Sequence, residues 1–439
     1  MSETALAVAG FSVLLAFIAA RLHVGLAMLV TGAAGYSILS SWPALLAYMK
    51  TNSYHQFANY TLSVIPLFIL MGALAEHSGL STKLFRAAAC LVGRLRGGLA
   101  YAVIVSCAGF GAICGSSVAT TATFGRAALP ELERYKYDGG FATGVIAVGG
   151  TLGILIPPSV ILVVYAIATE QNIAKLFMAA LVPGLLAAAF YCVTIYFVVR
   201  RRPELAPIPA AVEAGETLRT VAAAWPALAV ALVVVGGIYG GVFTPTEGAA
   251  VGVAAMFVIG VLQRALGWAE LRSALLQTAS TTGMIFIILL GSEVFNAFLA
   301  LSQLPTNLAA SIVEMQWPPY AVLAALLACY ILLGAVMDEL AMLLLTLPVF
   351  FPVVAGLDFG LPAEEQAIWF GVLVLVVVGM GLTAPPIGLN VFVVSAIAVR
   401  TPIAQTYRGV LPFLLADFVR LALLLAFPAL ALGMVRWLG

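Results

Sequence analysis

The chain has 439 residues, of which 63% are hydrophobic and only 9% are charged. This composition excludes a water-soluble globular protein and predicts an all-α polytopic membrane protein, because many windows exceed the roughly 20 apolar residues that span a bilayer. The formal net charge of +1 gives no electrostatic support for nucleic-acid binding. The five cysteines include no CxxC pair, so neither a metal cage nor a disulfide framework is predicted.

Long apolar runs follow one another along the whole chain, and most are predicted to be single helices. They cover residues 4–20, 24–40, 61–80, 98–129, 140–170, 176–199, 222–242, 247–266, 274–300, 320–355, 366–399 and 410–437. No basic residue precedes the first run, so it is predicted to be a spanning helix rather than a cleaved signal peptide.

The run near residues 98–130 contains the unusual stretch GFGAICGSSVATTATFG. Glycines there break a helix, which is tolerated at membrane depth only where the freed backbone groups are buried or line a polar cavity. The hydroxyls of Ser116, Ser117 and Thr120 then become candidate contacts for a cation or a substrate. The alternatives are a tightly packed interface of small residues, or hydroxyls bonded back to their own helix.

Basic residues flank this run on both sides, with Arg94 and Arg96 before it and Arg126 and Arg134 after it. Lysine and arginine in short loops mark the cytoplasmic face of a membrane protein. A single crossing would place one of the two clusters outside. A re-entrant hairpin over about 98–130, with its tip near Gly115, keeps both clusters inside and is the preferred interpretation.

The run from about 140 to 170 contains GGTLGILIPPSVILVVYA. The pair Pro157-Pro158 removes two backbone donors and clashes with the preceding turn, so a helix broken into two halves is predicted. A polar, proline-containing stretch at 206–221 follows and is predicted to be a cytoplasmic linker.

The second half of the chain repeats these features in the same order. In VGMGLTAPPIGLNVFVVSAI at 378–397, Pro385-Pro386 corresponds to Pro157-Pro158, and Gly381 corresponds to Gly153. In GAVMDELAMLLLT, Gly334 stands for Gly111 of the first half. The predicted second hairpin covers about 320–355, and the second broken helix covers about 366–399.

The repeat predicts a first unit at 1–205 and a second unit at 222–439. Each unit has three helices, a hairpin, a broken helix and a final helix, which makes about ten crossings, two of them broken, and two re-entrant hairpins. The distribution of Lys and Arg places the N-terminus and the second hairpin's entrance outside, so the two units are inverted. Paired interruptions in two inverted halves indicate the midplane site of a secondary transporter.

Asp338 lies in an apolar run near the second hairpin tip. An intramembrane carboxylate is a functional-site candidate by default, so Asp338 is predicted to hold or support a sodium ion. The alternative is a carboxylate that caps the N-terminus of a half-helix. The substrate is expected between the two hairpin tips. Its predicted contacts are Ser116, Ser117, Thr120, Pro157, Pro158, Pro385, Pro386 and Asn390, the last of which could instead satisfy freed backbone groups.

The sequence contains no G-x-S-x-G, no H-E-x-x-H and no Walker A motif. We therefore expect neither an enzyme nor an ATP-driven pump motor.

These motifs resemble the large membrane subunit of tripartite ATP-independent periplasmic (TRAP) transporters. The resemblance rests on GFGAICGSSVATTATFGRAALPEL, YKYDGGFATGVIAVGGTLGILIPPSVILVVYA, IAKLFMAALVPGLL, MDELAMLLLTLPVFFPVV and GMGLTAPPIGLNVFV, and it covers nearly the whole chain. It implies sodium-coupled import of an organic anion by an elevator-type movement in a bacterial inner membrane. It also implies two partners, a periplasmic substrate-binding protein and a small four-helix membrane subunit.

The resemblance further implies two sodium sites, each between a hairpin tip and a break. The first would comprise Gly115, Ser116, Ser117, Gly149, Gly150 and Thr151. The second would comprise Asp338, Gly379, Met380, Gly381 and Thr383. This chain departs from the family pattern at Cys114, where the family often has a small polar residue.

Two alternatives to this function stay open. The first is a stand-alone ion-coupled carrier of related hairpin architecture, which would transport without a binding protein. The second is a protein of another class, either a passive channel, which would conduct without saturation, or an intramembrane enzyme, which the absence of a catalytic constellation disfavours.

Overall fold

The computed structural model describes residues 3–207, 214–315 and 317–438 of the chain, and every regular element in these ranges is a helix. The predicted linker at 206–221 falls partly outside the described residues, which resume at Ala214 with the start of a helix. The prediction of an all-α membrane protein is confirmed for the described part of the chain.

The described part of the first half, residues 3–207, contains twelve helices of α or 3₁₀ type. They are α1 (Glu3–Ala19), α2 (Val24–Leu39), α3 (Trp42–Phe57), η1 (Tyr60–Ser63), α4 (Val64–His77), α5 (Leu80–Val92), α6 (Gly98–Cys114), α7 (Ser117–Arg134), α8 (Gly139–Leu155), α9 (Val160–Ala168), α10 (Ile173–Arg201) and η2 (Pro203–Leu205).

The second half, as far as it is described, contains ten. They are α11 (Ala214–Tyr239), α12 (Pro245–Leu262), α13 (Trp268–Leu301), α14 (Leu304–Glu314), α15 (Pro319–Gly334), α16 (Glu339–Ala355), α17 (Ala363–Gly381), α18 (Leu389–Ile397), α19 (Ile403–Ala426) and α20 (Ala429–Leu438).

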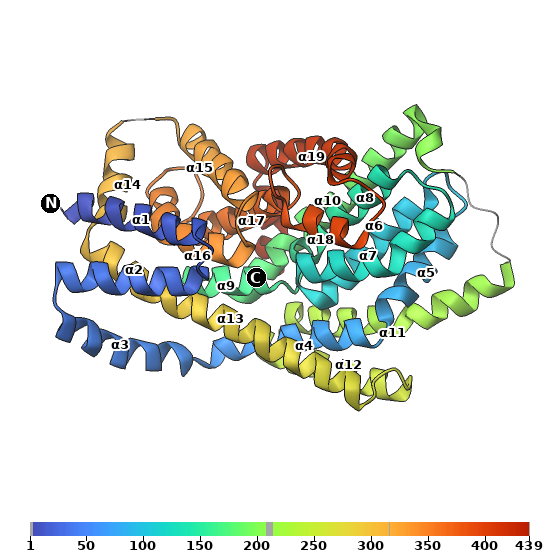
Figure 1. The fold of residues 1–439 in the computed structure, drawn as a ribbon, viewed down its shortest axis with the longest axis horizontal. Coiled ribbons are helices and arrows are strands. Elements are labelled where there is room, and N and C mark those ends of the chain that lie inside the picture. Colours follow the sequence, from blue (N-terminus) through green and yellow to red (C-terminus); the bar gives the residue numbers. More distant parts are fainter. Residues whose placement is uncertain (1–2, 208–213, 316, 439) are drawn as a thin grey trace.

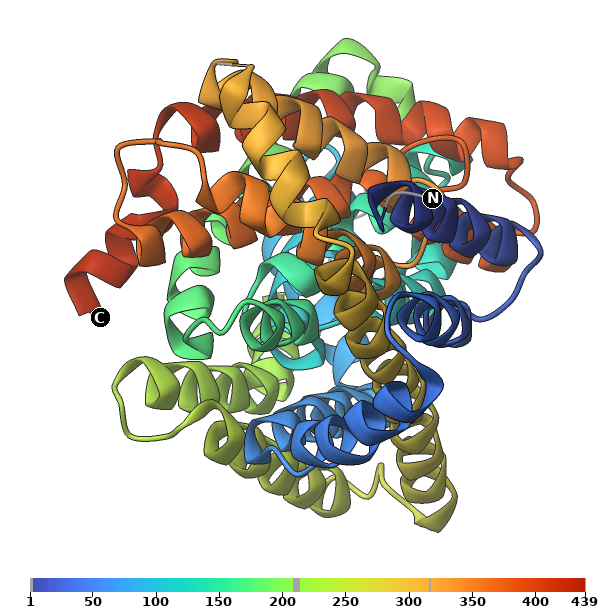
Figure 2. The same cartoon turned by 90° about the vertical axis from the view of Figure 1, so that its left-hand side faces the viewer.

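The long helix α13 runs along much of the length of the molecule and packs against α2, α4 and α16 (Figure 1). In the end-on view of Figure 2, the blue helices α1 to α3, the olive helix α12 with the start of α13, and the red helices α19 and α20 lie on the outside. Apolar side chains on these outer helices are strongly exposed, including Leu262 at 77% and Trp268 at 80%. Such faces suit contact with lipid.

The first parts of the two predicted broken helices, α8 and α17, lie at the centre of the molecule. Every residue from Gly140 to Leu155 in α8 is buried, and so is every residue from Gln366 to Gly381 in α17. A helix that is apolar all round belongs in a protein interior, so these two helices form the core around which the others pack.

Seven described helices are long and apolar enough to cross a membrane, or eight if α8 and α9 count as one bent span. The two first helices, α1 and α2, have only 17 and 16 residues. Multiple membrane spans are therefore present, while the predicted total of about ten crossings stays a prediction.

The segments predicted as hairpins are pairs of helices with very short connections. α6 and α7 are separated by Gly115 and Ser116, and α15 and α16 by residues 335–338. The segments predicted as broken helices are α8 with α9, bent by 44°, and α17 with α18.

Three described α-helices had no counterpart among the predicted runs. α3 contains Lys50 and polar residues, so its sequence is not an apolar run. α5 was expected as part of a basic loop, but it is an amphipathic helix that buries Leu84 and Phe85 against α6 and α11. α14 is an eleven-residue helix between α13 and the second hairpin.

Candidate functional site

The first hairpin tip is joined to the first break by backbone contacts. Gly115 ends α6 with φ +65°, a conformation that favours glycine, and a Cβ there would lie 2.8 Å from the carbonyl oxygen of Pro158. The carbonyl of Gly115 accepts from the N–H of Val160 at 3.4 Å. Ser116 caps α7, with its hydroxyl oxygen 3.4 Å from the N–H of Ala119.

The second hairpin tip has a similar arrangement. The carbonyl of Ala335 accepts from the N–H groups of Ile387 at 3.2 Å and Gly388 at 3.1 Å. Asp338 caps α16, and its Oδ2 accepts from the N–H groups of Leu340 at 3.1 Å and Ala341 at 3.3 Å. Asp338 thus occupies the capping position that was the alternative to a sodium ligand, and only one of its two oxygens is used by these bonds.

Equivalent glycines bring each hairpin against its break. A Cβ on Gly111 would lie 3.0 Å from Cα of Gly153, and a Cβ on Gly381 would lie 2.8 Å from Cα of Gly334. These are the glycines that the sequence repeat aligned. Both contacts need a residue without a side chain, because backbone meets backbone there.

The proline pairs differ in their surroundings. Both peptide bonds, Pro157-Pro158 and Pro385-Pro386, are cis. The first pair is buried and the second is exposed. The hydroxyl of Tyr407 on α19 donates to the carbonyl oxygen of Pro386 at 2.9 Å and contacts that of Ile387.

Asn390 connects the two halves of the chain. It is fully buried on α18, and its Nδ2 donates to Oγ of Ser117 at 2.7 Å and to the carbonyl oxygen of Ala147 at 3.1 Å. The structure therefore brings two predicted substrate contacts together, Ser117 and Asn390. Thr120 instead donates to the carbonyl of Ser116 at 2.7 Å, which is the helix-bonded alternative.

Two buried oxygen atoms that accept no hydrogen bond from the described residues lie beside this bridge. Oδ1 of Asn390 and Oγ1 of Thr121 are buried, and neither has a partner in the described part of the chain. Gly150 lies close to both side chains, since a Cβ there would be 1.8 Å from Oγ1 of Thr121 and 3.2 Å from Nδ2 of Asn390. Hydroxyl, amide and carbonyl oxygens in such a place can coordinate a small cation. Sequence reasoning did not select Thr121.

The other residues predicted to bind sodium spread over a wider area. A Cβ on Gly149 would meet Cys107 on α6, away from Asn390. A Cβ on Gly379 would lie 3.6 Å from Cβ of Thr151, so members of the two predicted sites are neighbours. The hydroxyl of Thr383 donates to the carbonyl of Met380 at 3.0 Å.

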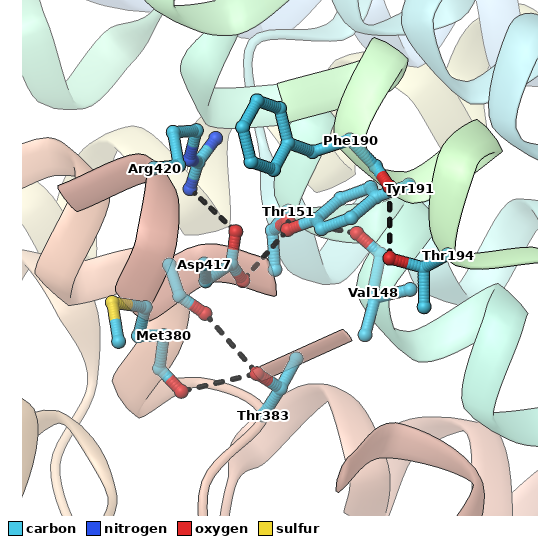
Figure 3. Close-up of polar contacts among 10 residues, drawn as sticks. Val148, Thr151, Phe190, Tyr191, Thr194, Met380, Thr383, Asp417 and Arg420 are labelled. Carbon is cyan, nitrogen blue, oxygen red and sulfur yellow. Dashed lines mark hydrogen bonds and ion pairs between the residues drawn. The ribbon is translucent and has the colours of Figure 1, made fainter. Parts of the chain in front are cut away.

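A buried polar chain leads away from Thr151 (Figure 3). Its Oγ1 lies 3.1 Å from the hydroxyl of Tyr191, which donates to Oδ2 of Asp417 at 3.0 Å. Oδ1 of Asp417 lies 2.8 Å from Nη2 of Arg420, and both side chains of this ion pair are at most 1% exposed. Within the described residues, Nε and Nη1 of Arg420 have no hydrogen-bond acceptor.

This row of buried polar side chains was not predicted from the sequence. The sequence feature that could have revealed it is a pair of opposite charges three residues apart in an apolar helix, because this spacing places both side chains on one helix face. Its link to Thr151 through Tyr191 on α10 is a long-range contact that spacing does not encode.

The family model described as "Tripartite ATP-independent periplasmic transporter, DctM component" matches residues 11–430. The large permease protein DctM of a C4-dicarboxylate TRAP transporter from Pseudomonas aeruginosa is 37% identical to this chain, over 87% of each. The large permease protein SiaM of a sialic acid TRAP transporter from Vibrio cholerae is 32% identical, over 85% of this chain and 86% of SiaM.

A solved structure gives an independent comparison of the fold. The YdaH transporter of Alcanivorax borkumensis superposes with a TM-score of 0.61 over 87% of this chain and 88% of its own, at 15% identity. At that identity the likeness concerns the fold alone.

Proposed function

Because this chain belongs to the family of DctM components, the large membrane subunits of TRAP transporters, we propose that it is the permease of a sodium-coupled importer of an organic anion. The two relatives described above are named as large permease proteins of TRAP transporters. The observation that carries the proposal is the bridge of Asn390 to Ser117 beside two buried oxygens without donors. This bridge joins the two halves of the chain, each of which contains a broken helix, at one place.

Sodium binds, in this proposal, where each hairpin tip meets its break. The first site uses backbone carbonyls near Gly115 and Gly150 with the hydroxyls of Ser117 and Thr121. The second uses Asp338, whose Oδ1 is not engaged by the capping bonds, and carbonyls of the α17 end near Gly379. Unwound carbonyls and half-helix ends are the usual sodium ligands of interrupted transporter helices.

The substrate is a carboxylate held between the tips. Three helices begin there, α7, α16 and α18, and their N-terminal N–H groups carry a partial positive charge that suits an anion. A relative with 37% identity is named for C4-dicarboxylates, so succinate is the first substrate to test.

The remaining parts of the proposal concern the assembly. The chain lies in the bacterial inner membrane with its N-terminus in the periplasm, and its two repeats at 1–205 and 222–439 are inverted. It moves substrate by an elevator-type displacement of the hairpins. A small four-helix membrane subunit and a periplasmic substrate-binding protein are its partners.

Uptake of labelled succinate by cells tests the function. The host lacks its own succinate carriers and expresses this chain with its small subunit and binding protein. We expect uptake to fall at least tenfold when external sodium is replaced by potassium. Equal uptake in both media would contradict sodium coupling.

Omitting the binding protein from the same cells tests the rival function. Loss of uptake supports the tripartite transporter. Undiminished, saturable uptake would favour a stand-alone carrier, and uptake without saturation would favour a channel.

A further inference from the structure

A pocket of about 970 Å³ opens where the end of α10, the beginning of α8 and the first half of α19 meet. Three arginines line it, Arg201 and Arg202 at the end of α10 and Arg408 on α19. We propose that this pocket binds the headgroup of an anionic phospholipid.

The charges of the pocket are unbalanced. Arg201, Arg202 and Arg408 are exposed and make no ion pair with any described residue. The carboxylate of Asp138 also lines the pocket, but its Oδ1 caps α8 by accepting from the N–H of Phe141 at 2.9 Å. Three positive charges therefore face one carboxylate that is already engaged.

Some cations elsewhere on the protein form ion pairs with carboxylates. Nζ of Lys175 lies 2.7 Å from Glu364, and Nη2 of Arg436 lies 2.6 Å from Glu365. The pocket arginines have no such partner among the described residues, so an anion that enters the pocket meets three unpaired guanidinium groups. A phosphate suits guanidinium groups, because several N–H donors can reach its oxygens together.

The walls of the pocket indicate a lipid rather than a soluble anion. Phe197 on α10 and Leu411 and Leu415 on α19 line it and are 54%, 51% and 68% exposed. Exposed apolar side chains beside unpaired arginines offer acyl chains a place next to the phosphate. Basic pockets between helices on the cytoplasmic side are known to bind anionic headgroups, and the three arginines fall on the predicted cytoplasmic side.

The test compares lipid retention by the full-length protein in native mass spectrometry. Purified protein is exposed to equal amounts of phosphatidylglycerol, which is anionic, and phosphatidylcholine, which is zwitterionic. One variant carries Arg201→Gln, Arg202→Gln and Arg408→Gln. The control carries Arg94→Gln, Arg96→Gln and Arg272→Gln, which removes three exposed arginines outside the pocket.

We expect the wild type and the control to retain phosphatidylglycerol at least fivefold over phosphatidylcholine, and the pocket variant less than twofold. Equal retention by the pocket variant and the wild type would overturn the proposal, as would equal retention of the two lipids by the wild type. Displacement of phosphatidylglycerol by millimolar inorganic phosphate would assign the pocket to a soluble anion instead. If the triple variant unfolds, Arg408→Gln alone should give an intermediate ratio, and an unchanged ratio would overturn the proposal.

Discussion

Arg420 and Asp417 form an ion pair that is closed off from solvent inside an apolar helix bundle. Taking two charges into such an interior is costly, and their mutual attraction offsets the cost only when both partners stay in place. Asp417 is further stabilised by the hydroxyl of Tyr191, which also contacts Thr151. We infer that the pair holds Tyr191, and through it Thr151, in position at the end of α8.

Tyr191→Phe removes the hydroxyl that joins Thr151 to Asp417. We expect the free energy of unfolding to fall by about 1–3 kcal/mol, because a buried carboxylate oxygen loses its donor. We also expect half-maximal uptake to need several-fold more sodium, since Thr151 is a predicted sodium ligand. Tyr196→Phe, on the exposed side of the same helix, is the control and should change neither value.

The ion pair itself is tested by a double-mutant cycle. Arg420→Met alone leaves a buried carboxylate without its cation and should lower the free energy of unfolding by about 3–5 kcal/mol. Asp417→Leu alone should have a comparable cost. The double variant should recover most of that loss, and additive costs in thermal or denaturant unfolding would show that the pair is not coupled.

Asn390→Ala removes both hydrogen bonds that connect α18 to the first half of the chain. We expect succinate uptake to fall at least tenfold because Ser117 and Ala147 lose their donor beside the proposed sodium site. Asn296→Ala, a partly buried asparagine on α13, serves as the control and should keep most of the activity. Uptake by Asn390→Ala at the wild-type rate would remove Asn390 from the site.

At the scale of single residues, the sequence indicated which residues could belong to the site but not which of them contact one another. Ser117 and Asn390 were both selected, and they touch across 273 positions of sequence. Thr121 was not predicted as a site residue, because the sequence does not distinguish a threonine that bonds to its own helix from one that faces a neighbouring helix. Asp338 was selected for its charge, while its capping geometry depends on where α16 begins.

At the scale of elements, the paired glycines Gly153 and Gly381 set how closely each broken helix approaches its hairpin. A Cβ on Gly153 would lie 2.4 Å from Oγ1 of Thr120, and one on Gly381 would lie 2.8 Å from the carbonyl carbon of Gly334. Alanine at either position should lower the free energy of unfolding by about 1–3 kcal/mol through overpacking. Gly236→Ala, which would meet nothing within 4 Å, should be neutral or slightly stabilising.

The helix interruptions were the most predictable feature of the elements. Proline pairs and glycine clusters act locally, so α8 ends at Leu155 and α17 ends at Gly381, just before the two proline pairs. α3 and α5 were not predicted because each is part polar, and their helical state depends on packing. α5, for example, buries Leu84 and Phe85 only because α6 and α11 lie beside it.

At the scale of the whole molecule, the inverted topology is testable by labelling. In a background without the five native cysteines, Lys136→Cys lies in the loop before α8 and Asp358→Cys in the loop before α17, both at exposed positions. We expect a membrane-impermeant maleimide added to spheroplasts to label Asp358→Cys and not Lys136→Cys. The opposite pattern would reverse the orientation of the chain.

The number of crossings illustrates what composition leaves open. α1 and α2 are apolar but have only 17 and 16 residues, so length alone does not decide whether they span the bilayer. The membrane class follows from composition because so many apolar side chains have no place in water. The path of each short helix depends on neighbours and lipid, which composition does not describe.

Substrate and sodium are proposed to enter together through the site shared by the two halves of the chain. The most direct measurement follows labelled succinate and ²²Na⁺ in the same proteoliposomes, with this chain and its small subunit in the membrane and the binding protein outside. We expect the influx of each solute to require the other, and both to be lost without the binding protein. Succinate influx that continues unchanged when choline replaces sodium would contradict this expectation.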